Sequence, residues 1–210
     1  MAGKKQHPGE GRSAKDAVFL NIPYDEQFIP LFMAYVVGIR AYGLIPRATL
    51  EIPGGVRRLD RIASLIRSCV YSVHDLSRVE IDPAPPPTPR FNMPFELGLA
   101  VAFHWRPSTK HTWFVLETAK WRIQKSLSDL NGTDVYVHEG NVEGVFRELA
   151  KAFVRINRQP TVKHMTTVYH RINDLLPKFM ADAGTNDPFQ ARVFHDVSVY
   201  AGALADELEN

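Results

Sequence analysis

The chain has 210 residues, which fits one globular domain or one domain with a small appendage. Hydrophobic residues make up 45% and charged residues 23%, so the chain can bury a sizeable core, and this composition argues against bulk disorder. Its 25 basic and 23 acidic side chains leave a formal net charge of +2, which argues against nucleic acid or an anionic membrane as the main partner. The one cysteine, Cys69, excludes an internal disulfide and a cysteine-rich zinc site.

Residues 1–16 are rich in Gly, Lys, Gln, Pro and Ser and show no apolar periodicity, which predicts a disordered tail. This tail contains no apolar stretch, so we expect no signal peptide. No apolar run in the chain approaches the roughly 20 residues of a membrane span, and we therefore expect a cytoplasmic protein.

From residue 17 to residue 75, short apolar runs alternate with stretches in which apolar residues recur every three or four positions. This alternation predicts strands that are separated by amphipathic helices. Gly43 is placed as a helix-terminating glycine. The predicted strands are 17–22, 44–48 and 69–75, and the predicted helices are 28–42 and 59–66.

Residues 77–92 hold five prolines, and such a segment is predicted neither to pair in a sheet nor to continue a helix. A loop of this length is often functional. A helix is predicted from Pro94 to about His104, and further elements follow it. These are strands at 112–116 and 135–137 and a helix at 142–156.

Alternating strands and helices, with strands that are apolar on both faces, predict an α/β domain at 17–158 with a five-stranded parallel sheet and helices on both faces. Residues 159–210 contain two helical patterns and no clear strand, so we expect a C-terminal helical extension. It would pack on the sheet domain or on a second subunit.

Candidate binding residues follow from this fold, because open parallel sheets bind ligands beyond the carboxyl ends of their strands. If the first and third strands are neighbours, polar residues of three segments converge on one crevice. They come after the first strand (Asn21, Tyr24, Asp25), after the third strand (Asp75, Ser77, Arg78) and at the end of the proline loop with the following helix (Arg90, Asn92, Glu96).

Glu96 is the central candidate, because it follows a long loop and lies in an otherwise apolar helix. Asn92 is predicted to be the N-cap of this helix, and Pro94 suits its first turn. The small residues Gly98, Ala100 and Ala102 are expected to let the helix approach the sheet closely. The alternative is a solvated carboxylate that is stabilised only by the helix dipole.

Asp75-Leu76-Ser77, followed by a loop and by Asn92-Met93-Pro94-Phe95-Glu96-Leu97-Gly98-Leu99-Ala100, resembles the Asp…Glu-Leu-Gly-x-Ala pattern of nucleoside 2-deoxyribosyltransferases and the glutamate-bearing helix of bacterial TIR-like domains. The resemblance implies a flavodoxin-like fold and cleavage or transfer of an N-glycosidic bond, with Glu96 as the central catalytic residue. Two departures leave the substrate contacts open. Pro94-Phe95 replaces the Trp-Cys pair of TIR-like domains, and Arg90 or Asn92 stands where the transferases carry a further aspartate.

The resemblance implies NAD⁺ or a related nucleotide as the substrate and no other cofactor. Nicotinamide leaves as a neutral molecule, so one carboxylate near the anomeric carbon suffices. Glu96 and Asp75 are the predicted catalytic residues, and Asp75 and Ser77 would bind ribose hydroxyls. Arg78 and Arg90 are candidates for phosphate oxygens and Tyr24 for stacking. Asp75 could instead cap a turn, Arg90 could be solvated and Tyr24 could be core packing.

Other features rank lower. Backbone amides and arginines of Pro53-Gly54-Gly55-Val56-Arg57-Arg58 could hold a phosphate, although a plain turn is the more usual outcome of such a string. The eight histidines show no metal-ligand spacing, so no metal site is expected. We expect a homo-oligomer, and the resemblance points to antiphage defence or signalling. Two other functions stay open: a non-catalytic nucleotide-binding or assembly module, and a nucleoside or nucleotide deoxyribosyltransferase or hydrolase.

Overall fold

The main sheet is all-parallel and five-stranded. A computed structural model describes residues 16–51, 57–78, 81–82, 84–107 and 110–209. The strands β1 (Ala17–Asn21), β2 (Ile45–Ala48), β3 (Tyr71–Asp75), β6 (Thr112–Glu117) and β7 (Val135–Val137) lie in the order β2-β1-β3-β6-β7. This is the flavodoxin-like strand order, so the predicted fold class is confirmed. The expected neighbours β1 and β3 pair directly.

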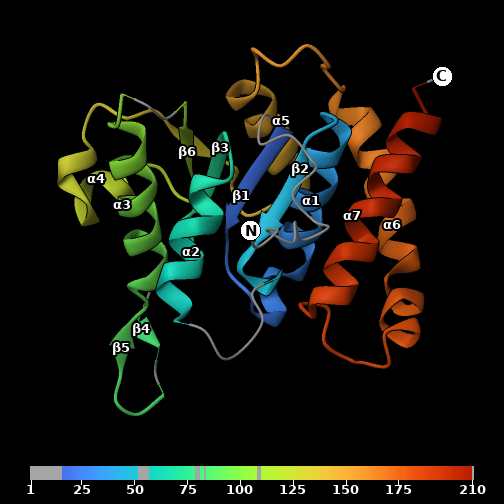
Figure 1. Cartoon of the computed structure of the whole chain (residues 1–210), viewed down its shortest axis with the longest axis horizontal. Helices are drawn as coiled ribbons and strands as arrows, with labels where there is room; N and C mark the ends of the chain where they lie inside the picture. Colours follow the sequence, from blue (N-terminus) through green and yellow to red (C-terminus); the bar gives the residue numbers. More distant parts are fainter. Residues whose placement is uncertain (1–15, 52–56, 79–80, 83, 108–109, 210) are drawn as a thin grey trace, which may run out of the picture.

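Helices cover both faces of this sheet (Figure 1). One face carries α1 (Ile29–Ala41) and α5 (Val142–Ala152), and the other carries α2 (Arg58–Arg67) and α3 (Asn92–His104). The consecutive β1 residues Phe19 and Leu20 are both fully buried, Phe19 in the apolar cluster under α2 and α3 and Leu20 in the cluster under α1. Burial of alternate side chains on opposite faces explains why the strands lack a polar side.

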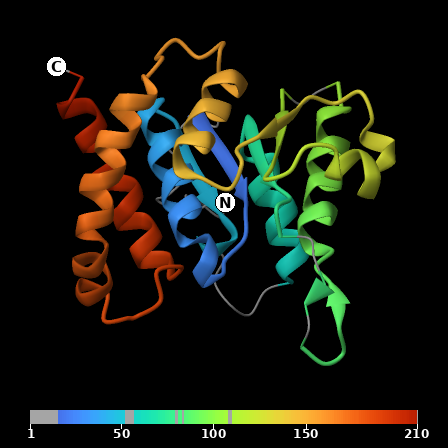
Figure 2. The ribbon, with the colours of Figure 1, turned by 180° about the vertical axis from the view of Figure 1, so that it is seen from behind.

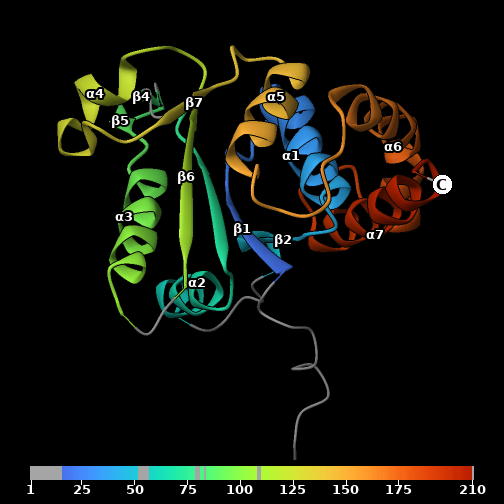
Figure 3. The ribbon, with the colours of Figure 1, turned by 90° about the horizontal axis from the view of Figure 1, so that it is seen from above.

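The C-terminal helices form a further layer outside α1 (Figure 3). They are α6 (Val162–Asp182) and α7 (Ala191–Glu207), which confirms the predicted helical extension. Their buried residues Val168 and Val197 belong to the same apolar cluster as Val36 of α1. The predicted tail lies outside the described residues except for Asp16. None of the described helices is both long and apolar enough to cross a membrane.

Gly43 terminates α1. Gly43 adopts φ +76°, and its N–H donates to the Arg40 carbonyl oxygen at 2.9 Å while the N–H of Leu44 reaches back to the Ile39 carbonyl oxygen at 3.2 Å. This pattern satisfies the last helix carbonyls and needs a left-handed residue, which glycine adopts without steric cost. The predicted helix stop is confirmed, and it directs the chain into β2.

The proline loop contains a short hairpin that projects beyond α3, apart from the main sheet (Figure 2). Its strands β4 (Ile81–Asp82) and β5 (Thr88–Pro89) pair antiparallel, with Ile81 opposite Pro89. The prediction that residues 77–92 cannot pair in a sheet was therefore wrong. Both strands of a two-stranded ribbon are edge strands, and an edge accommodates a proline that has no N–H to donate.

Candidate functional site

A cavity of about 350 Å³ lies where the ends of β1 and β2 meet the starts of α2 and α3. The position is the one expected for a ligand site in this fold, beyond the carboxyl ends of the strands. It is lined by residues of five chain segments: Asn21, Ile22, Pro23, Tyr24, Thr49, Arg58, Arg90, Asn92, Met93 and Glu96. Five of the predicted site residues are thus brought together, namely Asn21, Tyr24, Arg90, Asn92 and Glu96.

Among the described residues that line the cavity, Glu96 is the only acid. Its side chain is 7% exposed, and burial raises its pKa from 4.5 to about 7, against an opposing effect of the Arg58 charge. No side chain or backbone group among the described residues makes a hydrogen bond or an ion pair with the Glu96 carboxyl group. The predicted alternative of a fully solvated carboxylate therefore does not describe Glu96, which is a buried acid poised to ionise near neutral pH.

The start of α3 differs in detail from the prediction. Phe91 is the N-cap residue and makes no side-chain cap, whereas Asn92 is the first helical residue, so the Asn92 N-cap prediction was wrong. A helix whose side-chain cap is missing leaves its first N–H groups free for other acceptors. The close-approach prediction holds only for Ala100, which is fully buried, because Gly98 and Ala102 lie on the exposed face.

Tyr24 forms a wall of the cavity rather than an isolated stacking platform. Its hydroxyl accepts a hydrogen bond from Thr49 at 3.4 Å, and burial raises its pKa. The ring packs against Phe32 of α1 and against Phe189, which precedes α7, with centroid distances of 6.3 and 5.7 Å. The C-terminal extension therefore supports the cavity wall from behind.

Guanidinium groups give the cavity positive charge. Arg90 and Arg58 both line it, and Arg58 sits in the exposed first turn of α2. Asp25 forms ion pairs with Arg90 and with Arg78, in which its Oδ2 lies 3.8 Å from Nη1 of Arg90 and 3.3 Å from Nε of Arg78. Asp25 and Arg78 do not belong to the lining residues, so of these three side chains only Arg90 lines the cavity. The sequence indicated Arg58 only within the lower-ranked string 53–58, as a possible phosphate contact, and the structure places it among the lining residues of the cavity.

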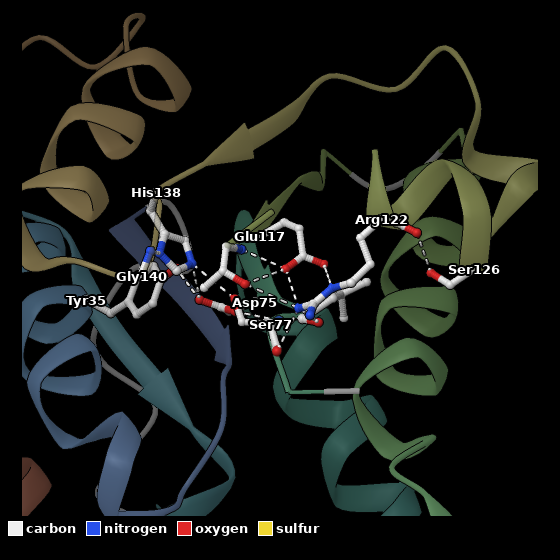
Figure 4. A network of polar contacts seen from close by, with 10 residues as sticks. Tyr35, Asp75, Ser77, Glu117, Arg122, Ser126, His138 and Gly140 are labelled. Atoms are coloured by element: carbon white, nitrogen blue, oxygen red, sulfur yellow. Dashed lines mark hydrogen bonds and ion pairs between the residues drawn. The ribbon is translucent and has the colours of Figure 1, made fainter. Parts of the chain in front are cut away.

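Asp75 and Ser77 are placed elsewhere, in a buried polar network (Figure 4). Asp75 is fully buried and accepts hydrogen bonds from the hydroxyl of Tyr35 at 2.6 Å and from the backbone N–H of Ser77 at 2.8 Å. Nε2 of His138 lies 3.0 Å from Oδ2 of Asp75 and 3.1 Å from Oγ of Ser77. Because the N–H of Gly140 donates to Nδ1 of His138, the histidine proton is on Nε2, facing the carboxylate.

An ion pair closes this network on the side of α4 (Arg122–Ser126). Nε of Arg122 donates to Oε2 of Glu117 at 2.8 Å, and Nη2 donates to the carbonyl oxygen of Ser77 at 2.7 Å. Glu117 and His138 directly follow the apolar parts of β6 and β7, so the strand-end rule that selected Asp75 also marks them. The contacts tie β3, β6 and β7 together, and among the described residues Asp75 belongs to this network whereas Glu96 belongs to the cavity lining.

The described residues include no group of three or more His, Cys, Asp or Glu side chains that could hold a metal ion. Comparisons with protein-family models, with curated proteins and with solved structures find no match for this chain. The functional argument therefore rests on the cavity and on the residues that line it.

Proposed function

We propose that this protein is an N-glycosidase that hydrolyses NAD⁺ or a related nucleotide, as its resemblance to TIR-like domains implies. The observation that carries the proposal is Glu96, a single buried carboxyl group in the lining of a cavity that also holds two arginines. A cavity of this size accommodates the reacting part of a nucleotide.

One carboxyl group fits the chemistry of a cationic leaving group. In NAD⁺ the bond between C1 of the ribose and the ring nitrogen of nicotinamide breaks with its electron pair going to nitrogen, so neutral nicotinamide leaves without a proton. The ionised Glu96 would stabilise or trap the oxocarbenium-like carbon, and water then adds and releases one proton, giving ADP-ribose. O-glycosidases need a second, acidic carboxyl group because their leaving oxygen must be protonated.

The pKa of Glu96 supports this role when the charge of the substrate is included. A pKa of about 7 leaves the carboxyl group part-ionised at neutral pH in the free protein. The positive nicotinamide ring would lower that pKa on binding and favour the ionised form. Arg58 and Arg90 would pair with the diphosphate, because guanidinium groups bind phosphate oxygens with directed hydrogen bonds.

The raised pKa also favours a second candidate, cleavage of a nucleoside or nucleoside monophosphate. A neutral Glu96 could donate its proton to a departing purine or pyrimidine. Such a base is a poorer leaving group than nicotinamide, because it carries no positive charge in the substrate. This reaction would need the protonated carboxyl group and would therefore be fastest below pH 7, in contrast to NAD⁺ cleavage.

The test incubates the purified protein, at several protein concentrations, with NAD⁺ and separately with nucleosides and their monophosphates, and separates the products. We expect nicotinamide from NAD⁺, lost in Glu96→Gln and kept in Glu143→Gln, which removes an exposed carboxylate from α5. Free base released only from nucleosides or monophosphates would favour the second candidate. Thermal stabilisation by NAD⁺ that stays intact would indicate a binding module, and the enzyme proposal would then be wrong.

A further inference from the structure

A chain of buried hydrogen bonds runs from the cavity to the opposite end of β3. Nδ2 of Asn21 lies 2.9 Å from Nδ1 of His74, and Nε2 of His74 lies 2.8 Å from Oγ of Ser72. Ser72 Oγ in turn lies 2.9 Å from Nε2 of His111, whose Nδ1 lies 2.8 Å from the carbonyl oxygen of Cys69. The four side chains of this relay are each at most 4% exposed.

The two ends of the relay fix the direction of every bond in it. Nδ2 of Asn21 also contacts the carbonyl oxygen of Met93 at 2.8 Å, and a carbonyl only accepts, so the amide nitrogen rather than the oxygen must face both partners. Nδ1 of His74 is therefore an acceptor, and its proton is on Nε2.

At the other end of the relay, the contact with Cys69 determines which nitrogen of His111 carries the proton. The carbonyl oxygen of Cys69 requires a proton on Nδ1 of His111, and in the neutral ring, which burial favours by lowering the pKa, Nε2 of His111 is then an acceptor. Ser72 then accepts from His74 and donates to His111, which uses its one hydroxyl proton. Both rings are neutral in this pattern, consistent with burial, which lowers the pKa of His111 and lowers that of His74 to about 3.

The relay leaves one polar atom of the Asn21 side chain for the cavity. Both amide hydrogens are used by Met93 and His74, so the carbonyl oxygen Oδ1 is the atom that these bonds do not occupy, and Asn21 lines the cavity with Glu96. The other His74 tautomer would place two N–H groups against each other, and rotating the amide would place its oxygen against the Met93 oxygen. Either change costs a buried hydrogen bond and leaves buried groups unsatisfied.

We propose that His74, held by Ser72 and His111, is a positioning residue that keeps the carbonyl oxygen of Asn21 turned into the Glu96 cavity, where it accepts a hydrogen bond from a ribose hydroxyl of the nucleotide. The ribose part rests on the proposed function, since it requires a nucleotide sugar beside Glu96. A ribose hydroxyl is the donor that such a sugar brings within reach of an acceptor near its anomeric carbon.

The first experiment needs no ligand. The ¹⁵N chemical shifts of the imidazole nitrogens, measured at pH 7 in the full chain, report which nitrogen of each ring carries the proton. We expect the Nε2–H form for His74 and the Nδ1–H form for His111. The Nδ1–H form or a protonated ring at His74 would overturn the positioning role whatever the protein binds.

The second experiment uses a matched pair of variants in the Glu96→Gln background, where bound NAD⁺ should stay intact. His74→Asn keeps an acceptor near the place of Nδ1, whereas His74→Leu has a similar size and no acceptor. The affinities for NAD⁺ and for analogues that lack one hydroxyl of the nicotinamide ribose are compared by calorimetry, with far-UV circular dichroism as a folding control. We expect the parent and His74→Asn to prefer NAD⁺ by about 5- to 10-fold over one analogue, and His74→Leu to lose that preference.

The outcomes separate this inference from the proposed function. If NAD⁺ binds but the parent does not discriminate any hydroxyl, or if His74→Leu discriminates as the parent does, the inference is wrong and the proposed function stands. If neither NAD⁺ nor the analogues bind, the proposed function fails and the ribose assignment fails with it. If His74→Leu does not fold, Asn21→Leu provides the same comparison at the acceptor itself.

Discussion

Glu96→Gln should stabilise the protein, and by an amount that depends on pH. The rise of the Glu96 pKa from 4.5 to about 7, at about 1.4 kcal/mol per pKa unit, corresponds to about 3 kcal/mol. Below pH 4.5 the carboxyl group is protonated in both the folded and the unfolded chain, and it costs nothing. As the pH rises from 4.5 through 7, the unfolded chain loses this proton first, so the wild-type protein loses stability that the glutamine variant keeps.

Denaturant unfolding of both proteins at intervals from pH 4 to pH 8.5 measures this difference. We expect it to grow from near zero at pH 4 to about 3 kcal/mol at pH 8, with a Tm increase of about 6 to 12 °C for the variant at the alkaline end. Glu143→Gln is the control, because its carboxylate is exposed and its removal should change stability little at any pH. A difference for Glu96→Gln that is constant with pH, or that favours the wild type at pH 8, would refute the burial argument.

Three further predictions concern the buried network, the helix glycines and the arginines. Tyr35→Phe removes a donor from the buried Asp75 carboxylate and should cost about 2 kcal/mol in chemical denaturation, whereas Tyr42→Phe removes a buried hydroxyl that has no partner among the described residues and should be neutral or stabilising. An equal loss of stability in Tyr35→Phe and Tyr42→Phe would contradict a stabilising hydrogen bond from Tyr35 to Asp75. Gly98→Ala should stabilise by about 0.5–1 kcal/mol, because an added Cβ meets nothing within 4 Å, whereas in Gly38→Ala it would lie 2.5 Å from Leu149 and should cost about 1–3 kcal/mol. Arg58→Gln should raise the KM for NAD⁺ about tenfold and leave that for nicotinamide riboside, which has no phosphate, unchanged; equal effects on both substrates would contradict a phosphate contact.

The fold could be predicted from the sequence because its signals are local. Apolar runs such as Val18 to Leu20 and the left-handed position of Gly43 depend on a few neighbouring residues, and both behave as expected. The strand order came from the assumption that the first and third strands pair, which the register of β1 and β3 bears out. The hairpin in the proline loop was not predicted, because the rule that proline is excluded from central strands was applied to a two-stranded ribbon, in which both strands are edge strands.

The site was predictable only in part, because sequence position does not fix where a side chain points. Asn21, Glu96 and Asp75 all occupy strand-end or helix-start positions, yet Asp75 turns to Tyr35 and His138 and away from the cavity. His138 also follows a strand, but it lies far along the chain, and strand-end position alone does not indicate that its ring contacts Asp75. The hydrogen-bond relay of Asn21 and His74 could not be predicted from the sequence either, because it depends on the pairing of two strands and on the hydrogen-bond partners of two histidine rings.

The pH dependence of kcat/KM for nicotinamide release from NAD⁺ tests the central claim most directly, because it joins the buried carboxyl group to the bond that breaks. If the ionised Glu96 of the free protein is required, kcat/KM should rise about tenfold per pH unit on the acid side, level off above a pKa of about 7, and be lost in Glu96→Gln. A rate that falls as the pH rises through 7, or one that the glutamine variant retains, would contradict the account.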